Sequence, residues 1–433
     1  MHVKTRLTPA LILSLAFSTA SVALAQPSPT IDKQAQALRK SRTFVALQTA
    51  ITNDYERTVR EGVTLTEIPA PTFKEEARAK AFAQLLQDAG LQNVEIDAVG
   101  NVTALRKGEG KGPLVAVIAH LDTVFPEGVP VKVRREGLTL HAPGVGDDTF
   151  PLAVLATYAR ALAAAKVRTR ADILFVGSVG EEGLGDLRGV RHLFQHGPYA
   201  GKIASVIVFE PAAAGQLINV AVGARRYKVT FTGPGGHSFS DFGIVNPGYA
   251  MAGAMTAISR ITTDPATRTT YNVGVVSGGT SPNVIPTQMS MSIDMRSEDP
   301  RALEALEARL RDALDQAVAG ENAARSTLKG SIRLETEVLG DRPAGRTGKE
   351  DPLVQRAEAA MRSAGLTPRY DSASTDANLP MSLGLPAIVI GPGFSAKDGH
   401  SPEESLTLDP AHDPLNIATA LQVILLQTGV EHP

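Results

Sequence analysis

A buried apolar strand that runs into two ionisable residues is the first feature of this sequence that could do chemistry. The stretch VAVIAHLDTV leads from an apolar run into His120 and Asp122. Burying either group is costly unless it is paired. Residues two apart on a strand face the same side, so a carboxylate there can fix the tautomer of the imidazole. The pattern predicts His120 as a metal ligand and Asp122 as its partner.

Acidic residues or histidines follow every other apolar strand that the sequence predicts. Glu181 and Glu182 follow ADILFVGSV, Glu210 ends ASVIVFE, and His400 follows PAIVIGPGF. Asp147 lies in GVGDDTF, between the first strand and its helix. Active sites in open α/β sheets lie beyond the carboxyl ends of the strands. We therefore expect these side chains to meet at one edge of a sheet.

Such a cluster would need a counter-charge. Asp147, Glu182 and Glu210 would repel one another, because neighbouring carboxylates disfavour each other's ionisation. Divalent cations relieve this repulsion. Histidines mixed with carboxylates favour zinc, with cobalt or manganese as the other candidates, over calcium and magnesium, which prefer oxygen ligands. The composition of the cluster therefore predicts a divalent metal site.

The elements that must position these residues alternate between strand and helix. Continuous apolar strands with helices between them indicate a sheet that is covered on both faces. We predict an α/β fold with a mostly parallel mixed sheet sandwiched by helices. Helical spacing is found at 76–90, 151–166 and around 188–194, and apolar strands at 114–120, 171–179 and 204–210.

Net charge and length limit the possible partners and domains. The chain has 433 residues, with 43 basic and 45 acidic side chains, a formal net charge of −2 and no basic stripe. Nothing in this pattern indicates a nucleic acid or an anionic membrane surface as the partner. We expect a small-molecule substrate. A chain of this length is also expected to form more than one domain.

Residues 1–25 are predicted to be a cleaved signal peptide. Basic residues precede an apolar run from about Ala10 to Leu24, and Ala25 stands before Gln26. The run is shorter than the roughly 20 residues of a membrane-spanning helix, so we expect no membrane association after cleavage. The chain has no cysteine, and an exported protein of this size can fold on its core alone. We predict export, to the periplasm.

A smaller α+β domain is predicted at residues 222–340, inserted between two parts of the main domain at 26–221 and 341–433. It begins with the alternating strand and glycine-rich turn RYKVTFTGPGGHSF. Further predicted strands and helices follow: NPGYAMAGAMTAISRI, YNVGVVSGG, QMSMSIDMRS, RALEALEARLRDALDQA and SIRLETEV.

Five motifs occur in an order and at separations that resemble a known family. HLDTV, GVGDD, GEEG, FEP and GHSPEE resemble the co-catalytic dinuclear zinc metallopeptidases, which include aminoacylase, glutamate carboxypeptidase, succinyl-diaminopimelate desuccinylase and peptidase T. The resemblance covers nearly all of the chain after the signal peptide. It implies two divalent ions bridged by Asp147, with His120 and Glu210 completing one shell and Glu182 and His400 the other.

The same resemblance gives Glu181 the role of general base. Two metals lower the pKa of water and polarise the scissile carbonyl. Glu181 would take a proton from the metal-activated water and deliver it to the leaving amine.

The inserted domain resembles the lid or dimerisation domain of that family, and its GGHS and SPNVIP motifs match as well. This resemblance implies that His237 stabilises the oxyanion, often from the partner subunit. It places Asn283 and Arg296 in or near the substrate cleft. A homodimer formed through the lid is the corresponding expectation.

Two later segments carry further substrate-side candidates. STDAN resembles a family segment whose aspartate and asparagine, here Asp376 and Asn378, support the site. Gly391 and Gly393 follow an apolar strand and would let the backbone approach a ligand. An ordinary tight turn explains these glycines equally well. Residues 149–151 (TFP) depart from the family, where many members have lysine followed by a small residue and glycine.

We predict a dinuclear metal-dependent peptidase or amidohydrolase that cleaves short peptides as an exopeptidase. The alternative enzyme is a glutamate-carboxypeptidase-like or aminoacylase-like hydrolase of N-acyl amino acids. The alternative from another class is an exported small-molecule binding protein of the same fold without catalysis. Glu181 counts against that alternative, because a binding protein has no use for a free base. A structural metal site is disfavoured, since such sites close with four protein ligands, usually cysteines.

Overall fold

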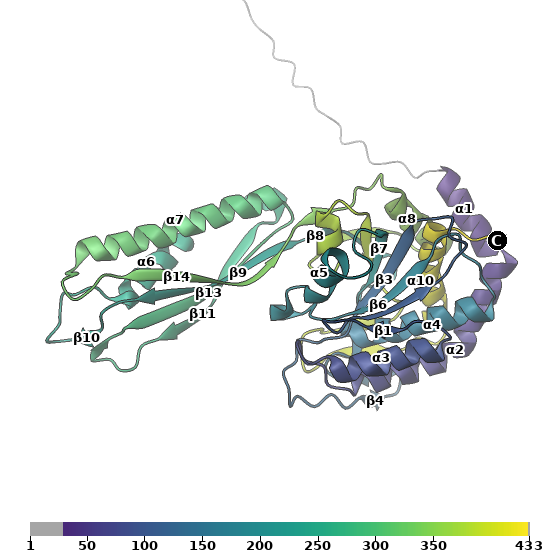
Figure 1. The fold of residues 1–433 in the computed structure, drawn as a ribbon, viewed down its shortest axis with the longest axis horizontal. Coiled ribbons are helices and arrows are strands. Elements are labelled where there is room, and N and C mark those ends of the chain that lie inside the picture. Colours follow the sequence, from purple (N-terminus) through teal and green to yellow (C-terminus); the bar gives the residue numbers. More distant parts are fainter. Residues whose placement is uncertain (1–28, 432–433) are drawn as a thin grey trace, which may run out of the picture.

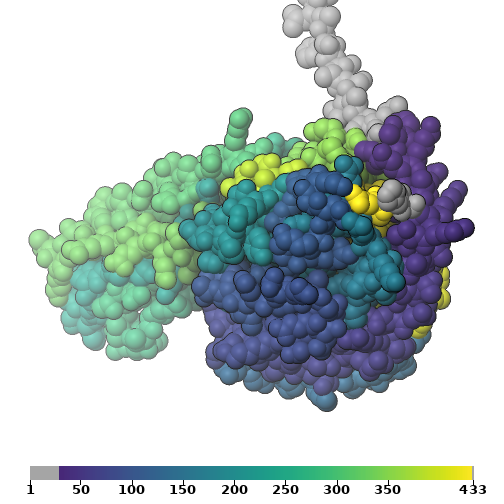
Figure 2. Space-filling model, turned by 45° about the vertical axis from the view of Figure 1, so that its right-hand side comes forward, coloured from purple at the N-terminus to yellow at the C-terminus, as the bar shows by residue number. Residues whose placement is uncertain are grey.

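The computed structural model describes residues 29–431 and divides them into two lobes. Figure 1 shows a large lobe built on a helix-covered sheet and a smaller lobe that extends from it. In Figure 2 the smaller lobe projects to the left of the large one. The predicted signal peptide lies outside the described residues. Within residues 29–431, no helix is both long and apolar enough to cross a membrane.

The large lobe confirms the predicted α/β fold. Its nine strands are β1 (Glu95–Ile96), β2 (Val102–Arg106), β3 (Leu114–His120), β6 (Ile173–Ser178), β7 (Ile203–Phe209), β8 (Gln216–Ala221), β15 (Gly345–Arg346), β16 (Arg369–Ala373) and β17 (Ala387–Ile390). Their order is β1-β2-β6-β3-β7-β17-β8-β15, with β16 paired to β8. The central strands β6, β3, β7 and β17 are parallel, so their carboxyl ends meet at one edge.

Strand β3 shows why the central strands are apolar throughout. Val115 and Val117 pack into one core cluster, whereas Ala116 and Ile118 pack into the other. Both faces of the sheet are therefore buried. One face is covered by α2 (Arg42–Thr66), α3 (Glu76–Asp88), α4 (Phe150–Ala164), α8 (Pro352–Ser363) and α10 (Asp413–Thr428), and the other by α5 (Arg188–Gln195) and α9 (Asn378–Ser382).

Two N-terminal helices, α1 (Pro29–Lys40) and α2, precede the first helix that the sequence analysis predicted. The hydroxyl oxygen of Ser41 accepts a hydrogen bond of 3.1 Å from the Phe44 N–H and begins α2. Helix α2 packs along α4, while α1 lies against α8 and α10. These helices thicken the catalytic lobe on the side of the sheet that faces away from α5.

A small antiparallel sheet brings two segments of the site together. Its strands are β4 (Arg134–Glu136), β5 (Thr139–His141), β18 (Ser395–Lys397) and β19 (Ser405–Thr407), in the order β18-β19-β5-β4. Strand β5 leads into the turn η1 (Val145–Thr149), which holds Asp147. The loop between β18 and β19 holds His400. The pairing of β19 with β5 therefore brings His400 to the GVGDD turn.

The smaller lobe, hereafter the lid, contains a separate sheet in the order β11-β13-β9-β14. It extends from Gly223 to Arg342, close to the predicted 222–340. All its pairings are antiparallel, and α6 and α7 pack on the sheet. Its elements are β9 (Gly223–Thr232), β10 (Gly236–His237), α6 (Pro247–Ile258), η3 (Pro265–Thr267), β11 (Thr270–Gly278), β12 (Val284–Ile285), β13 (Gln288–Ser297), α7 (Pro300–Ala324) and β14 (Arg333–Arg342).

Helix α7 illustrates how the lid builds its own core. Asp299 accepts hydrogen bonds from the N–H groups of Arg301 and Ala302, and Pro300 occupies the first turn, where its missing N–H costs nothing. Leucines at helical spacing then face the sheet and pack with Val229 and Ile293: Leu303, Leu306, Leu310 and Leu314. The lid core is separate from the two clusters of the large lobe.

Candidate metal centre and cleft

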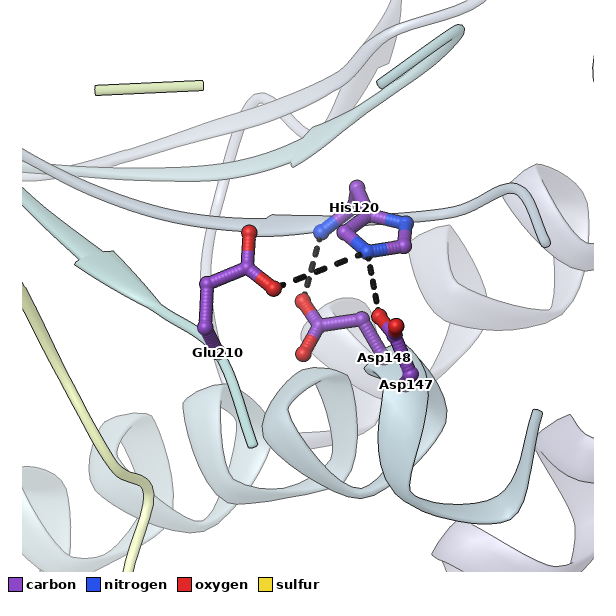
Figure 3. A group of neighbouring side chains, drawn as sticks. All are labelled: His120, Asp147, Asp148 and Glu210. Carbon is purple, nitrogen blue, oxygen red and sulfur yellow. Dashed lines mark hydrogen bonds and ion pairs between the residues drawn. The ribbon is translucent and has the colours of Figure 1, made fainter. Parts of the chain in front are cut away.

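The ends of two parallel strands bring His120 beside two carboxylates (Figure 3). His120 ends β3, and its Nε2 atom lies 2.8 Å from Oδ1 of Asp147 and 3.9 Å from Oε2 of Glu210, which follows β7. Asp148 lies below them and accepts a 2.8 Å hydrogen bond from the His120 N–H. Ligand atoms of all four residues lie within 4.8 Å of one another. This spacing suits a single cation.

A second group shares Asp147 with the first. Nε2 of His400 lies 3.1 Å from Oδ2 of Asp147 and 2.9 Å from Oε1 of Glu182. One oxygen of Asp147 therefore faces His120 while the other faces His400. His400 itself has a left-handed backbone, φ 64°, which a non-glycine residue adopts rarely and most often at functional sites. The geometry suits a carboxylate that bridges two cations.

The donor atoms fit a pair of divalent cations. Oε1 of Glu210 is buried and has no hydrogen-bond partner among the described residues. A buried carboxylate oxygen is costly unless it is hydrogen-bonded or binds a metal. Two histidines with carboxylates are a ligand set that suits zinc and similar transition metals. The residues predicted as ligands thus lie together in two groups that meet at Asp147.

Protons would compete with cations for this cluster. Burial works against the charged form of His120, but the carboxylates of Asp148, Asp122 and Asp147 outweigh it and raise the pKa of His120 well above its usual value. Hydrogen bonds to Asp147 and Glu182 raise the pKa of His400 to about 10. Without a cation, both imidazoles would therefore hold a proton at neutral pH.

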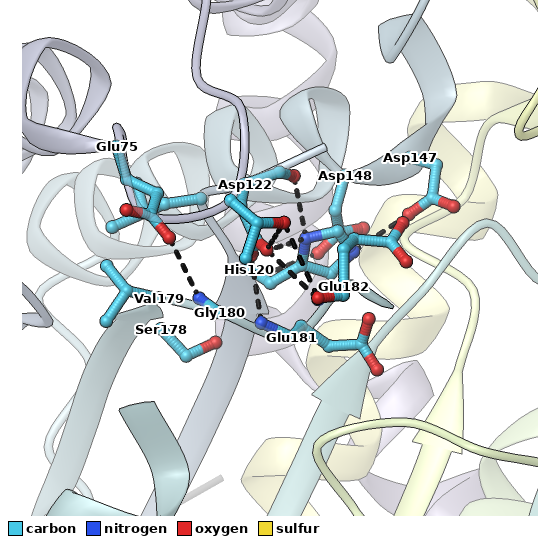
Figure 4. A network of polar contacts seen from close by, with 12 residues as sticks. Glu75, His120, Asp122, Asp147, Asp148, Ser178, Val179, Gly180, Glu181 and Glu182 are labelled. Atoms are coloured by element: carbon cyan, nitrogen blue, oxygen red, sulfur yellow. Dashed lines mark hydrogen bonds and ion pairs between the residues drawn. The ribbon is translucent and has the colours of Figure 1, made fainter. Parts of the chain in front are cut away.

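Asp122 fixes the turn that carries both glutamates (Figure 4). Its carboxylate accepts hydrogen bonds of 3.0 Å from the N–H groups of Glu181 and Glu182, and one of 2.9 Å from the hydroxyl of Thr72. Nδ1 of His120 lies 3.0 Å from the main-chain oxygen of Asp122 but 3.6 Å from its carboxylate. Asp122 therefore orients the imidazole chiefly through its main chain, and its carboxylate holds the glutamate turn.

Glu181 is paired with an arginine that the sequence analysis did not predict. Nη1 of Arg342, at the end of β14, lies 3.0 Å from Oε1 of Glu181, and Nη2 donates to the main-chain oxygen of Glu181. Glu181 also lies close enough to His120 and Glu182 to share a cation with them. Burial raises the pKa of Glu181 to about 8, although Arg342 opposes the shift. Nothing in the local sequence GDRPAG marks Arg342 as a site residue.

Glu404 closes the loop that carries Asp147. Its buried carboxylate accepts hydrogen bonds from the N–H groups of Gly144 (2.8 Å), Gly146 (2.7 Å) and Asp147 (3.0 Å). Glu404 stands in the same loop as His400 and therefore ties the histidine's segment to the bridging carboxylate. It is the last residue of GHSPEE, yet the sequence analysis gave it no role.

A cleft of about 320 Å³ opens over the cluster. Three arginines line it beside the carboxylates: Arg226 from β9, Arg296 from β13 and Arg342. Nε of Arg226 and Nε of Arg296 each lie 2.9 Å from Asp294, so the two guanidinium groups share one counter-charge. Arg296 lies at the cleft as the sequence analysis expected, and Arg226 joins it unpredicted.

His237 and Asn283 lie together, but far from the cleft of their own chain. The Ser238 N–H donates a 3.0 Å hydrogen bond to the main-chain oxygen of Asn283 at the outer end of the lid. Arg226 lines the cleft, and Thr232 is six residues further along β9, about 20 Å away at the usual strand rise. Strand β10 follows beyond it. Within one chain, these two residues do not complete the site.

Asp376 and Asn378 lie behind the cleft. Ser178, at the end of β6, donates a hydrogen bond to the fully buried Asp376, and burial raises the pKa of Asp376 to about 6. Nδ2 of Asn378 donates to the main-chain oxygens of Val222 (2.8 Å) and Pro343 (3.0 Å). Asn378 thereby holds the two segments that connect the lid to the large lobe. Neither side chain lines the cleft.

Gly391 and Gly393 require a correction. They line a different cavity, and the close backbone approach that glycine permits is made to this chain rather than to a substrate. A Cβ on Gly391 would lie 1.9 Å from the main-chain oxygen of Ala212, and one on Gly393 would lie 2.6 Å from the nitrogen of Ile417. Close packing explains both glycines, and the structure does not bring them to the cleft.

Comparison with known proteins shows the family. The sequence pattern of peptidase family M20/M25/M40 matches residues 116–423, which include all five motifs. The chain belongs to this family. The resemblance noted in the sequence is thereby confirmed.

Individual M20 relatives agree with the fold. Carboxypeptidase G2 of Pseudomonas sp. (strain RS-16) is 27% identical over 346 residues, which are 75% of this chain and 76% of that protein. Two Pyrococcus relatives are 40% and 36% identical over 129 residues, and the match spans only 34% and 35% of their lengths.

Solved structures show the same architecture. The aminopeptidase PepT of Bacillus cereus superposes with a TM-score of 0.68 at 20% identity, over 85% of this chain and 98% of that one. YXEP of Bacillus subtilis, a dinuclear metal binding peptidase of the M20 family, superposes with a TM-score of 0.63 at 19% identity, over 88% and 100% of the two chains.

The role of Glu404 can be tested by removing its carboxylate. Glu404→Ala leaves three buried N–H groups without an acceptor, each worth about 1–3 kcal/mol, so the loop that orients Asp147 should loosen. We expect metal affinity to fall roughly 10- to 100-fold, measured by competition with a chromogenic chelator. The exposed neighbour Glu403 is the matched control, and Glu403→Ala should bind metal normally. Unchanged affinity in Glu404→Ala would remove the positioning role.

Metal binding should release protons. Because the pKa of both His120 and His400 is raised when no cation is bound, cations must displace protons at neutral pH, and affinity should rise with pH. We expect release of about two protons per chain at pH 7. Calorimetric titration in buffers of different ionisation enthalpy measures this number, and His400→Ala should lower it by about one. A value near zero would contradict the protonation described here.

Proposed function

We propose that this protein is a dinuclear metal-dependent exopeptidase that hydrolyses short peptides. The observation that carries the proposal is the Glu181–Glu182 turn. Glu182 faces His400 in one of the two ligand groups, while its neighbour Glu181 lines the cleft and pairs with Arg342. Adjacent glutamates thus present one carboxylate to the metal centre and another to the substrate.

The side chains around the cleft divide the chemistry between them. Two divalent ions would polarise the scissile carbonyl and lower the pKa of the attacking water. Glu181 is placed to accept a proton on its carboxylate and to return it to the leaving amine. Asp122 holds the backbone of Glu181 in place through the 3.0 Å hydrogen bond. Arg342 steadies the base without lying between it and the cleft, since both residues line the cavity.

The arginines favour a substrate that ends in a free carboxylate. Guanidinium groups bind carboxylates in a two-pronged geometry. Arg226 and Arg296 share Asp294 as their common counter-charge, which leaves an excess of positive charge at the cleft. A cleft of about 320 Å³ accommodates small substrates. A peptide whose terminal carboxylate lies close to the scissile bond satisfies these conditions.

N-acyl amino acids are the second candidate, because they carry the same carboxylate next to an amide. The similarity to carboxypeptidase G2 favours this glutamate-carboxypeptidase-like or aminoacylase-like alternative. Zinc is the proposed metal, with cobalt or manganese as substitutes, on the basis of the histidine and carboxylate ligands. Export to the periplasm is proposed from the N-terminal signal pattern.

A homodimer through the lid is supported by the contrast between the edges of its sheet. The edge strand β11, TYNVGVVSG, has no charged residue and exposes Val275 and Val276. The opposite edge, β14, is RLETEVLGDR, with charges along its length. Charged side chains protect an edge strand, and an unprotected edge pairs readily with another strand. We propose that the second copy pairs at β11.

The activity is tested with a panel of di- and tripeptides, N-acyl amino acids and C-terminal glutamate conjugates. Glu181→Gln removes the proposed base but keeps the shape of the side chain, so we expect turnover to fall about 10²- to 10⁴-fold while metal content is unchanged. The wild-type protein should lose activity with a chelator and regain it with zinc. Wild-type protein that binds metal and cleaves nothing in the panel would favour the non-catalytic binding protein.

The dimer edge is tested by adding charge to β11. Combined Val275→Lys and Val276→Lys would bring like charges together across the pairing, which disfavours it. We expect a monomer by light scattering at micromolar concentration, with the fold retained by circular dichroism. Val338→Lys, at an exposed valine on β14, is the matched control and should remain a dimer. A dimer that survives the β11 substitutions would place the contact elsewhere.

A further inference from the structure

An exposed apolar patch surrounds His237 at the outer end of the lid. Phe239 and Phe242 are 87% and 86% exposed, and Leu328 is 97% exposed. Val284 is exposed as well and pairs with His237 between β10 and β12. These four apolar residues, hereafter the tip patch, have no counterpart in the lid core. Exposed apolar groups gathered in one place mark interaction surfaces more often than isolated ones do.

Neighbouring loops hold the tip patch together. The pairing of Lys329 with Asp241 brings the loop of Leu328 beside the loop of the two phenylalanines. Nδ1 of His237 accepts hydrogen bonds from the N–H groups of Phe239 (3.2 Å) and Ser240 (3.3 Å). An accepting Nδ1 leaves the proton of the neutral ring on Nε2. The patch therefore surrounds an imidazole whose remaining nitrogen is a hydrogen-bond donor.

A second group of exposed apolar residues lies at the mouth of the cleft. Phe73, Val124 and Leu184 are exposed, and Val124 lines the cleft itself. Phe73 follows Thr72, which bonds to Asp122, while Leu184 stands two residues after the ligand candidate Glu182, so all three lie on loops tied to the glutamate turn. We refer to these three residues as the rim patch. It faces the entrance through which a substrate must pass.

The two patches lie at opposite ends of the molecule, and contacts at the base of the lid keep them apart. Nη1 of Arg226 donates a 3.1 Å hydrogen bond to the main-chain oxygen of Gly183, and the Asp341 N–H donates one of 2.9 Å to Asp186. The lid is therefore fastened to the glutamate loop at its inner end while the tip extends away (Figure 1). The tip patch does not reach the rim of its own chain.

We propose that the tip patch docks onto the rim patch of a second copy of this chain. In a two-fold dimer each tip would cover the other copy's cleft, so that both contacts form together. Docking would bury apolar groups on both sides and present the Nε2–H of His237 to a cleft that lacks this donor. The proposal rests on the proposed dimer and goes beyond it by naming the two surfaces.

Crosslinking tests the contact directly, and the chain is well suited to it because it contains no cysteine. Phe242→Cys and Leu184→Cys are introduced together in the full-length protein, which is then treated with a short bis-maleimide. We expect a product of twice the chain mass on a denaturing gel. Phe242→Cys with Val45→Cys, an exposed position on α2, is the matched control and should give little of that product.

Each outcome decides the matter. A doubled mass for the first pair and not for the control supports docking between copies. A crosslink within one chain, located by peptide mass mapping, would show that the lid folds onto its own rim and would overturn the proposal. Equal yields from both pairs, or no product, would overturn it too. Because this readout does not need turnover, it stands even when no substrate is found.

Complementation adds a functional readout. One chain carries Glu181→Ala and the other carries Phe239→Ser with Phe242→Ser, and mixed dimers are isolated by two different tags. Docking between copies leaves one intact cleft served by one intact tip, so we expect about half of the wild-type rate per dimer. Mixed dimers without activity, or a Phe239→Ser, Phe242→Ser enzyme that is fully active alone, would contradict the proposal. Loss of activity in the wild-type protein would instead concern the proposed function.

Discussion

Like charges held together at one sheet edge are the constraint on which the rest of this structure depends. The carboxylates of Asp147, Glu182 and Glu210 lie close to one another because they stand after parallel strands or in the turn beside them. Their repulsion must be met by other groups. His120 and His400 flank Asp147 on its two oxygens. The same repulsion makes the site a strong attractor for divalent cations, so the cost in stability is also the source of its chemistry.

Backbone N–H groups do much of the work of positioning. Two buried carboxylates, Asp122 and Glu404, accept five N–H hydrogen bonds between them and hold the turns that carry Glu181, Glu182 and Asp147. Neither carboxylate belongs to a group with the geometry of a cation site. A fixed backbone leaves the ligand side chains little freedom, which lowers the entropic cost of binding a metal or a substrate.

The sequence predicted what depends on periodicity and strand ends, and it missed what depends on long-range pairing. Residues after apolar strands meet at one edge for topological reasons. Arg342 approaches Glu181 only because β14 returns to the large lobe, and no local pattern contains that return. Helix α2 was a different omission: its buried Phe44, Leu47 and Ile51 have helical spacing that could have been recognised. For Gly391 the residue type was informative, but it reported packing against Ala212.

The lid joins two regions with different physical demands. Its inner end contributes Arg226, Arg296 and Arg342 to the cleft and is fastened there by hydrogen bonds, so it behaves as part of the catalytic wall. Its outer end exposes His237 among apolar side chains that a solitary chain leaves in water. A rigid 25-residue helix, α7, spans the distance between the two ends. A rigid lid cannot serve its own cleft with both ends at once, so an unprotected β11 edge and an exposed tip are consistent consequences of one arrangement, in which the site is completed between copies.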